Sequence, residues 1–426
     1  MTVELPIIVI GCGISGLTLG IALHRMGFAV ALFDKVERLH AAGSGMSVIG
    51  NSLDLLQSLG IDWDDLSTCE ADVSLRDAQL ARLFAVPLTI DADLAARFGS
   101  VQRNCHRGQL QQALLRLYQG SICTGSRLLH YSYTPSGSVV AHFHDGKVVH
   151  GAMIVGADGL RSRVRASQLD EARCIRYSGY TCWRGLAPAA GRRDPFGACM
   201  FKTVLPPAGS ATSFTTGLLP DRRRFWALDH VQPAGVTVPP ERLRDVLATA
   251  TAGYGDEVQA LLARTPINDI VETDVYDCHS FAATFPRTAL LGDAAHPLAH
   301  HFGQGACLAI EDACRLARCL YENSRVVRLA GVGERRVMAA RDIEQALRDY
   351  GAWWYRVRAR LLVLISRLCG HVYMHNGESM LLRLLLLGGL VRPFVYVFVG
   401  VMFVLLFRSN RDLTVWLRAT MSRHAA

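Results

Sequence analysis

Three aspartates of this sequence each follow a short apolar run with a glycine close by, a setting in which a carboxylate can bind a ligand. Asp34 follows AVALF, Asp158 follows AMIVGA, and Asp293 follows TALLG. Apolar runs of this length are typical of buried strands, and a carboxylate at a strand end can accept hydrogen bonds from ligand hydroxyl groups. For Asp158 alone, a solvent-exposed turn before a helix N-cap explains the same residues.

Two adjacent histidines, His300 and His301, follow Asp293 in the stretch GDAAHPLAHH and raise the question of a metal site. A metal ion would need further ligands around the pair, and we expect neighbouring loop residues of this kind not to face one ion. Ordinary loop histidines are the first interpretation, a substrate-contacting or proton-handling His300 is the second, and metal binding is the third. We therefore predict no metal site.

The stretch IIVIGCGISGLTLGIALHRMG contains the pattern Gly11-x-Gly13-x-x-Gly16 between an apolar run and a helical segment that ends near Gly27. Such a strand, turn and helix lets a pyrophosphate approach the backbone at the helix N-terminus. Asp34 lies 18 residues beyond Gly16, where an acid can bind the ribose of a dinucleotide, either NAD or FAD. The predicted contacts of this region are Gly11, Gly13, Ile14, Ser15, Gly16, Asp34 and Lys35.

The loop after Asp293 carries Gly303-Gln304-Gly305 and precedes a helical segment that begins near Ala306. Glycines allow a ligand to come close to the backbone, and a helix N-terminus carries partial positive charge. We therefore expect an anionic ring at this position, with Gly305 and Ala306 as contacts.

The composition excludes several classes of protein. Of the 426 residues, 50% are hydrophobic and 19% are charged, which excludes a disordered chain. The net charge of +8 comes from scattered arginines without a basic stripe and interleaved aromatic residues, so we predict no nucleic-acid partner. The positive charge instead suits anionic cofactors or an anionic membrane surface. None of the 12 cysteines lies in a CxxC pair, and the N-terminus opens with a strand, so we expect a cytoplasmic protein.

Together, the glycine pattern, ADGLRSRVR and GDAAHPL resemble the flavoprotein monooxygenases of the aromatic-hydroxylase type, which include salicylate and urate hydroxylases, zeaxanthin epoxidase and quinolone hydroxylases. The resemblance covers roughly residues 5 to 320. It implies that Asp34 holds the adenosine half of FAD, that Asp158 lies near the pyrophosphate, and that Asp293 binds the ribityl or pyrophosphate portion. HRGQLQQALL is similar to the family's stretch in which an arginine, here Arg107, contacts FAD.

The resemblance also implies the chemistry. NADH or NADPH reduces FAD, dioxygen forms a flavin C4a-hydroperoxide, and one oxygen atom hydroxylates or epoxidises an apolar aromatic or polycyclic substrate. No second GxGxxG pattern exists, so the nicotinamide nucleotide is expected to bind transiently. Arg184, in YSGYTCWRGL, and His300, where family members commonly have proline, are the predicted catalytic residues. A flavin-dependent reductase, prenyl-type or halogenase-related and without monooxygenation, is the alternative function.

The strand and helix patterns and the resemblance together predict an α/β fold. A Rossmann-like FAD-binding domain is expected to be interleaved with an antiparallel-sheet substrate domain, followed by a helical C-terminus. We assign residues 1–70, 101–175 and 280–345 to the FAD-binding domain and residues 71–100 and 176–279 to the substrate domain. Residues 346–426 form the C-terminal helical part.

The stretch LLRLLLLGGLVRPFVYVFVGVMFVLLFR, residues 381–408, is strongly apolar. Between Arg392 and Arg408 lie 15 uncharged residues, Pro393–Phe407, which is short beside the about 20 residues of a spanning helix. Two interpretations are equally favoured. These helices pack on the substrate domain, or the flanking arginines hold a peripheral or monotopic segment on the cytoplasmic face of a membrane. The second would suit a lipophilic small-molecule substrate delivered from lipid.

Overall fold

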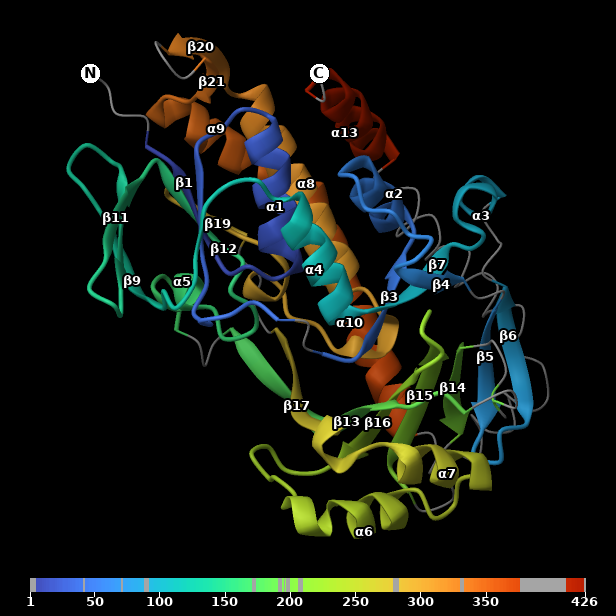
Figure 1. Ribbon diagram of the computed structural model, residues 1–426. Helices are drawn as coiled ribbons and strands as arrows, with labels where there is room; N and C mark the ends of the chain where they lie inside the picture. The colour runs from blue at the N-terminus through green and yellow to red at the C-terminus, as the bar shows by residue number, and fades with distance from the viewer. Residues whose placement is uncertain are drawn as a thin grey trace.

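The structure, a computed structural model, describes most of the chain from the first strand to a C-terminal helix (Figure 1). The apolar stretch 381–408, for which a membrane contact was considered, lies outside the described residues. The described residues are 5–40, 43–69, 72–87, 92–170, 174–190, 194, 196, 200–205, 210–278, 283–329, 333–375 and 411–424.

A six-stranded sheet lies in the upper left part of Figure 1, with the strand order β18-β19-β12-β1-β2-β8. The five strands from β19 to β8 run parallel, and β18 pairs antiparallel at one edge. All four residues of β1 are buried, which explains why its sequence IIVI is apolar without alternation. The strands are β1 (Ile7–Ile10), β2 (Val30–Phe33), β8 (Ile122–Cys123), β12 (Met153–Gly156), β18 (Thr284–Phe285) and β19 (Thr288–Leu290).

The carboxyl ends of these parallel strands lie at one edge of the sheet. The turn at Gly11 directly follows β1, and Asp34 directly follows β2. Asp158 and Asp293 come shortly after the ends of β12 and β19. The sheet therefore brings the predicted ligand residues from four separate segments of the chain to the same edge.

Alternate residues of β1 pack into two different layers. Ile7 and Val9 belong to the core shared with the helices α1, α4 and α8, whereas Ile8 and Ile10 pack against a three-stranded meander and α5. This alternation follows from the period of two along a strand. These elements are α1 (Ile14–Arg25), α4 (Arg107–Leu117), β9 (Leu128–Tyr133), β10 (Val139–Phe143), β11 (Val148–Gly151), α5 (Arg163–Ala166) and α8 (Gly305–Glu322).

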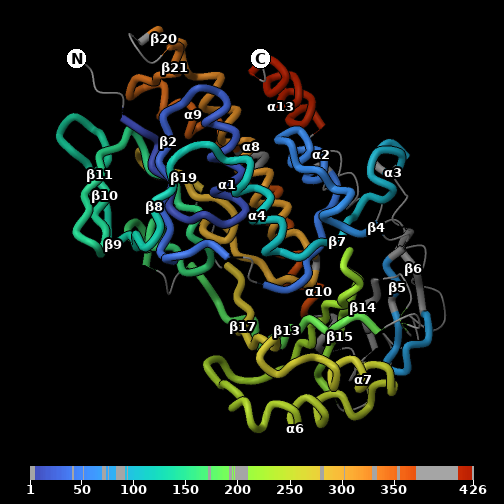
Figure 2. Tube along the Cα trace, viewed as in Figure 1, coloured from blue at the N-terminus to red at the C-terminus, as the bar shows by residue number. Residues whose placement is uncertain are grey.

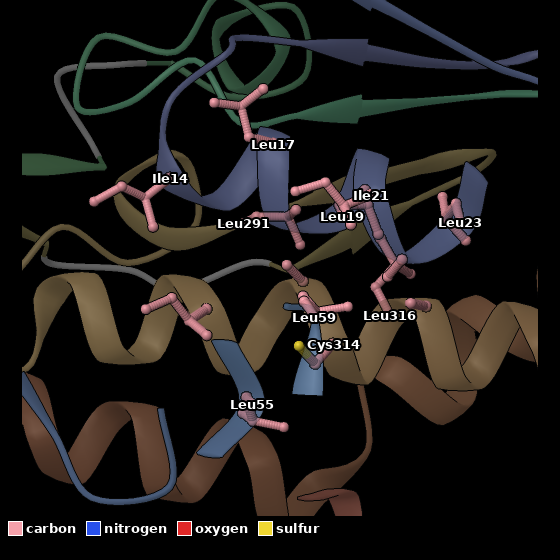
Figure 3. Packing of buried hydrophobic residues seen from close by; sticks show 14 of the residues in the cluster. Ile14, Leu17, Leu19, Ile21, Leu23, Leu55, Leu59, Leu291, Cys314 and Leu316 are labelled. Carbon is pink, nitrogen blue, oxygen red and sulfur yellow. The ribbon is translucent and has the colours of Figure 1, made fainter. Parts of the chain in front are cut away.

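Helix α1 is buried over most of its length and packs against α8, as Figure 3 shows. Leu17 and Leu19 of α1 and Leu316 of α8 are fully buried. Each fully buried leucine stabilises the fold by about 1.5–3 kcal/mol relative to an exposed one. This packing holds α1 in place, and with it the glycine turn at its N-terminus. The helix ends before Gly27, whose φ of 87° confirms the predicted C-terminal glycine cap.

A second sheet of seven strands has the order β17-β13-β16-β15-β14-β5-β6. Its described pairs are antiparallel, as predicted, with the single exception of the parallel pair of β5 with β14. The exception arises because β5 comes from an earlier segment, and strands that no hairpin joins can pair in parallel. The strands are β5 (Asp72–Asp77), β6 (Arg82–Pro87), β13 (Ile175–Ala187), β14 (Met200–Leu205), β15 (Thr212–Leu218), β16 (Arg224–Val231) and β17 (Val271–Cys278).

Helices α6 and α7 cover one face of this second sheet (Figure 1). Trp183, Phe214 and Trp226 of the sheet are fully buried in the core between them. A small sheet of β3, β7 and β4, with α2 and α3, lies between the two larger sheets. The elements are β3 (Gly45–Ile49), α2 (Asn51–Ser58), β4 (Ser67–Cys69), α3 (Ala92–Phe98), β7 (Gln102–His106), α6 (Pro240–Ala250), α7 (Asp256–Arg264) and the 3-10 turn η2 (Ile267–Asp269).

The C-terminal helices complete the fold, and α10 reaches from the first sheet's layers to the second sheet (Figure 2). None of the helices in the described part of the chain combines the length and the apolar character needed to cross a membrane. The remaining elements are the 3-10 turns η3 (Gly292–Ala294) and η4 (His300–Phe302), β20 (Arg325–Leu329), β21 (Gly333–Val337), α9 (Ala340–Tyr350), α10 (Trp353–His375) and α13 (Arg411–Arg423).

Helix α10 is anchored by polar contacts to both halves of the molecule. Arg358 Nη1 lies 2.6 Å from Oε2 of Glu311 in α8, and both side chains are 4% exposed. Ser366 Oγ donates to the carbonyl oxygen of Ala299, just before η4. Arg367 donates two hydrogen bonds to the buried carboxylate of Asp277 in β17. Helix α10 is therefore an integral part of the fold.

Replacing Arg358 by methionine should lower the apparent free energy of unfolding by about 3–5 kcal/mol, because Glu311 would stay buried without its cation. The control is Arg411→Met, since Arg411 forms an exposed ion pair with Asp93 and such pairs contribute about 0.2–1 kcal/mol. Chemical denaturation of both variants measures the difference. Similar small losses in the two variants would contradict a structural role for the buried pair.

Candidate active site

The turn after β1 depends on contacts that only glycine permits. Gly11 has a φ of +104°, and a Cβ atom there would lie 2.4 Å from the carbonyl oxygen of Ala157. A Cβ atom at Gly16 would lie 1.9 Å from the carbonyl oxygen of Gly11. Any side chain at either position would force these backbones apart. The turn is thus fixed against the end of β12 and against the start of α1.

Gly13 has a different role, because a Cβ atom there would face open space. It is the N-cap of α1, where no side chain caps the helix and the first turn contains no acidic residue. The first N–H groups of a helix, here those of Ile14 and Ser15, have no partner within it, and the helix dipole favours an anion. The N-terminus of α1 therefore fits the pyrophosphate of a dinucleotide such as FAD.

Two backbone N–H groups hold the Asp34 carboxylate. Its Oδ2 accepts a 2.7 Å hydrogen bond from the N–H of Cys12, and its Oδ1 accepts a 3.0 Å bond from the N–H of Val36. Carboxylate oxygens can each accept more than one hydrogen bond, so the oriented side chain can also receive ribose hydroxyl groups. The neighbouring Lys35 is exposed. Their contacts with FAD stay predictions.

Asp158 lies in the turn before α5, whose N-cap is Ser162, and Asp158 is partly buried where the alternative interpretation expected a solvent-exposed turn. Its Oδ2 accepts hydrogen bonds from the N–H groups of Arg163 and Val164 at 2.7 and 3.3 Å. Its Oδ1 is buried and has no partner in the described part of the chain. Burial raises the pKa of Asp158, and hydrogen bonds from Ser162 and from the backbone offset only part of that rise. The orphaned oxygen fits the predicted cofactor contact.

Arg165 connects the Asp158 corner to the Asp293 corner. It is 3% exposed, and its Nη1 donates to the carbonyl oxygens of Asp293 and Ala294 at 3.1 and 2.7 Å. Its Nη2 donates to the carbonyl oxygen of Leu160. A guanidinium has several donors in a fixed fork, so one buried side chain fixes two loops relative to each other.

Asp312 of α8 holds the Asp293 corner from the other side. Its Oδ2 accepts a 2.7 Å hydrogen bond from the N–H of Gly292 and lies 2.8 Å from Nε2 of His296. The side chains of His296 and Asp312 are both 0% exposed. Burial, the largest single effect, would lower the pKa of His296, but the charge and hydrogen bond of Asp312 together with the charge of Asp293 and a backbone hydrogen bond outweigh it, so this pKa is raised. The pair fixes the start of the GDAAHPL loop.

The Asp293 side chain is accessible to solvent, yet protein atoms surround it. This desolvation raises the pKa of its carboxyl, while the charges of His296, Arg107, Arg165 and Arg184 act in the opposite direction. Several cations from different segments of the chain therefore lie around this one carboxylate.

Two further features near Asp293 fit an anionic cofactor. A Cβ atom at Gly305 would lie 3.9 Å from Oδ1 of Asp293, and no side chain caps the N-terminus of α8 at Gly305 and Ala306. Arg107, at the start of α4, is exposed, and within the described ranges its guanidinium makes no hydrogen bond or ion pair. A free cation and an uncapped helix N-terminus both attract phosphate. These contacts also stay predictions.

The predicted catalytic residues Arg184 and His300 lie in contact with each other. Nη2 of Arg184 donates to Nδ1 of His300 at 3.3 Å, and its Nη1 donates to Oγ1 of Thr273 at 3.2 Å. Nε2 of His300 lies 2.9 Å from Oδ1 of Asp229, and Nδ1 of His301 lies 3.5 Å from Oδ2 of the same carboxylate. The end of the second sheet therefore carries a compact polar cluster.

The two adjacent histidines face one carboxylate, whereas only His300 belongs to the described set of side chains that could hold a metal ion. The turn η4 brings the rings of His300 and His301 to 4.7 Å from each other, and both contact Asp229. Ligand atoms of Cys182, Asp229 and His300 lie within 4.8 Å of one another, a set that could hold a metal ion. Attraction to Cys182 and to Asp229 raises the pKa of Arg184, so a fixed cation already neutralises this cluster. The absence of a metal stays a prediction.

Two residues of this region, Asp229 and Asp312, were not among the predicted site residues. Asp229 is a single acid in the apolar stretch RFWALDHV, and its side chain is 1% exposed. An acid within a buried strand needs a hydrogen-bond or ion-pair partner. The sequence around Asp229 therefore already indicates a functional or structural role for this residue. The sequence gives a weaker indication for Asp312, because an acid on a predicted helix is most simply placed on its solvent-exposed face.

Comparisons with known proteins agree with this geometry. A family model described as an FAD binding domain matches residues 4–328. Aurachin C monooxygenase/isomerase of Stigmatella aurantiaca is 32% identical over 329 residues, which cover 75% of this chain and 82% of that protein. An FAD-dependent urate hydroxylase of Klebsiella pneumoniae subsp. pneumoniae is 28% identical over 375 residues, 84% of this chain and 88% of that one. A crystal structure of Klebsiella pneumoniae HpxO with FAD and uric acid has a TM-score of 0.74 at 24% identity and covers 99% of this chain and 98% of that one.

The glycine turn, the two aspartate corners and these relatives define the class: the protein is an FAD-dependent monooxygenase, an oxidoreductase. The chain belongs to the FAD binding domain family, and its cofactor is FAD. The resemblance inferred from the sequence is therefore confirmed, as is the predicted α/β fold class.

Asp293→Ala should lower the retention of FAD, because the carboxylate is predicted to accept a hydrogen bond from the cofactor. The FAD-free variant should nevertheless be more stable than the FAD-free wild type above about pH 4. A raised pKa in the folded state means that the ionised carboxyl opposes folding above its unfolded pKa, and the alanine removes that cost.

Flavin absorbance after gel filtration and thermal unfolding of the FAD-free proteins at neutral and acid pH measure both effects. The control is Asp269→Ala in the 3-10 turn η2, an exposed position between α7 and β17, which should leave FAD retention unchanged. Undiminished FAD retention, or a less stable FAD-free Asp293→Ala variant at neutral pH, would refute the assignment.

Proposed function

We propose that the protein consumes NADH or NADPH and hydroxylates or epoxidises an apolar aromatic or polycyclic small molecule. The observation that carries this proposal is the position of Arg184. Its charge acts on Asp293 at the predicted cofactor corner, and its guanidinium contacts His300 beside the second sheet. One arginine thus links the cofactor side of the molecule with the side expected to bind substrate.

FAD, when bound, supplies the redox chemistry and the activation of dioxygen. The chain's own residues orient the substrate and exclude water. Arg184 presents a planar set of donors suited to a substrate oxygen atom. The His300 side chain is 29% exposed, so a ligand can reach it. Helix α10 contacts η4 through Ser366 and Gly370 and limits the access of water from that direction.

The surroundings of this cluster support an apolar substrate. Tyr180, Cys182, Val275 and Ala299 form a small buried apolar group directly beside Asp229 and the two histidines. Ligand sites of this kind combine apolar walls with a few polar groups that set orientation. A lipophilic ring with one polar substituent would suit both features.

The nicotinamide nucleotide and the membrane are parts of the proposal that rest on the sequence. No second glycine pattern is present, so NADH or NADPH is proposed to bind transiently. The arginines around the apolar stretch 381–408 support a peripheral contact with an anionic membrane surface, from which a lipophilic substrate could enter.

A substrate screen tests the proposed function. The purified FAD-bound protein is mixed with lipophilic aromatic and polycyclic compounds, and the oxidation of NADH and of NADPH is followed with oxygen uptake. A substrate should accelerate both processes and gain one oxygen atom by mass spectrometry. Accelerated oxidation without oxygen uptake, together with saturation of a double bond, would instead identify a flavin-dependent reductase.

Arg184→Lys should retain FAD but lose about tenfold or more of the substrate-stimulated oxidation, because an ammonium group does not replace a planar donor fork. The matched control is Arg176→Lys, in the same strand, where the arginine pairs with Asp277. Flavin content, thermal stability and stimulated oxidation are measured for both variants. A loss of stability alone in Arg184→Lys would show that Arg184 only pairs across the sheet.

A further inference from the structure

The outer face of α10 carries a row of exposed side chains. The inner face of this helix packs on the rest of the molecule, where Leu362 and Ile365 share a buried apolar cluster with Leu308 of α8. On the outer face, four exposed residues follow one another at intervals of four, and such residues form a ridge along a helix. The residues of this α10 ridge are Arg356, Arg360, Leu364 and Leu368.

The two leucines of the ridge form one apolar strip. Leu364 is 48% exposed and Leu368 is 55% exposed. Residues four apart on a helix are neighbours, so the two side chains lie side by side. Burial of their exposed surface would remove apolar area from water, which is favourable. The strip therefore suits a partner with an apolar interior.

The two arginines of the ridge have no partner within the described part of the chain. Arg356 and Arg360 are exposed, and neither guanidinium forms a hydrogen bond or an ion pair there. Their neighbours Arg358 and Arg367 differ, because each of these is paired with a buried carboxylate. The sequence of α10, residues 353–375, contains no aspartate or glutamate. The ridge thus combines an apolar strip with positive charge that the helix itself does not neutralise.

The order of the residues along the ridge suits the interface of a lipid bilayer. Arg360 precedes Leu368 by eight residues, which is about 12 Å along a helix axis. An amphipathic helix at a membrane interface buries its apolar side chains about 5–10 Å deep, while its cationic side chains stay at the level of the headgroups. A tilted α10 would therefore bring the leucines to the acyl chains and leave the arginines beside the phosphate groups.

Anionic lipid fits this ridge better than another part of this protein does. In a contact between two copies, the arginines would face a second α10, which has no acidic residue to pair with them. The apolar stretch 381–408 likewise contains no aspartate or glutamate, so it could cover the leucines but could not neutralise the arginines. An anionic lipid surface, by contrast, increases the binding constant about fivefold for each arginine near it.

We propose that the α10 ridge docks the protein on an anionic lipid bilayer. The proposal rests on the proposed function, because it names the surface through which a lipophilic substrate is taken from lipid. The leucines enter the boundary of the acyl chains, and the arginines bind the anionic headgroups. The surface consists of described residues of one helix and does not depend on the stretch 381–408.

The inner face of the same helix contacts the predicted substrate side of the molecule. Ser366 donates a hydrogen bond to the carbonyl oxygen of Ala299, just before η4. A Cβ atom at Gly370 would lie 2.8 Å from the ring of His301 in η4. An α-helix with its side chains is about 10–12 Å across. Docking through the outer face of α10 therefore holds η4 about one helix diameter from the headgroups.

Flotation with lipid vesicles tests the docking surface. The FAD-bound protein is centrifuged in a density gradient with vesicles of phosphatidylcholine alone or of phosphatidylcholine mixed with phosphatidylglycerol, at low and at high salt. The wild type should float with the mixed vesicles at low salt and bind them more weakly at high salt, because salt screens the arginines. Equal flotation with both kinds of vesicle would refute the assignment to anionic lipid.

Two double variants separate the parts of the ridge. Leu364→Gln with Leu368→Gln removes the apolar strip, and Arg356→Gln with Arg360→Gln removes the charge. Each double variant should bind the mixed vesicles about tenfold or more weakly than the wild type, and the arginine variant should also lose most of the salt dependence. FAD content and thermal stability should stay unchanged, because all four residues are exposed.

The matched controls are two double variants at exposed positions elsewhere. Leu129→Gln with Val148→Gln changes two apolar residues of the meander that are 41% and 52% exposed. Arg116→Gln with Arg242→Gln removes the same amount of charge from exposed positions on α4 and α6. Both controls should bind the mixed vesicles like the wild type.

The outcomes distinguish the docking surface from the proposed function. If the wild type does not float, or if the ridge variants float as well as the wild type, the docking surface is refuted and the proposed oxygenation of a substrate is unaffected. If the ridge variants lose binding but no compound causes oxygen uptake, the docking surface stands and the proposed function fails. A dimeric wild type and a monomeric leucine variant in analytical ultracentrifugation would make the ridge a contact between two copies and overturn the lipid assignment.

Discussion

The cofactor side of the molecule depends on one close approach of two backbones, that of Gly11 to Ala157. A Cβ atom at Gly11 would lie 2.4 Å from the Ala157 carbonyl oxygen, so the turn after β1 can reach the end of β12 only as glycine. The same turn sets the position of α1 through Gly16. The distance between the Asp34 and Asp158 corners, and the direction in which the uncapped helix N-terminus points, both follow from this contact.

The charged groups that hold the loops of the site in place differ from the polar groups that remain available to bind ligands. Arg165 and Asp312 are buried, and they use their charges to bind backbone groups of the Asp293 corner. Buried charges are tolerated when hydrogen bonds satisfy them. The Asp158 Oδ1 atom and the Arg107 guanidinium, by contrast, have no partner within the described ranges. Rigid loops with available polar atoms at their tips are what a tightly oriented cofactor requires.

The sequence predicts the parts of the structure that local rules control. The glycine turn, the capped end of α1 at Gly27 and the strand ends at Asp34 and Asp293 follow from short-range periodicity and backbone preferences. The shared contact of His300 and His301 with Asp229 does not, because it depends on how β16 and η4 meet across the chain. The parallel pairing of β5 with β14 is likewise a long-range outcome that no local pattern encodes.

The order in which the strands are synthesised determines when the six-stranded sheet can assemble. β1 and β2 emerge early, but β12 arrives only at Met153–Gly156 and β19 only at Thr288–Leu290. The edge that collects Asp34, Asp158 and Asp293 therefore stays incomplete until about two thirds of the chain has been made, and contacts of such long sequence separation form slowly. Nascent chains would wait with exposed strand edges until then. The supply of FAD and of chaperones during synthesis should accordingly decide how much of this protein matures into holoenzyme.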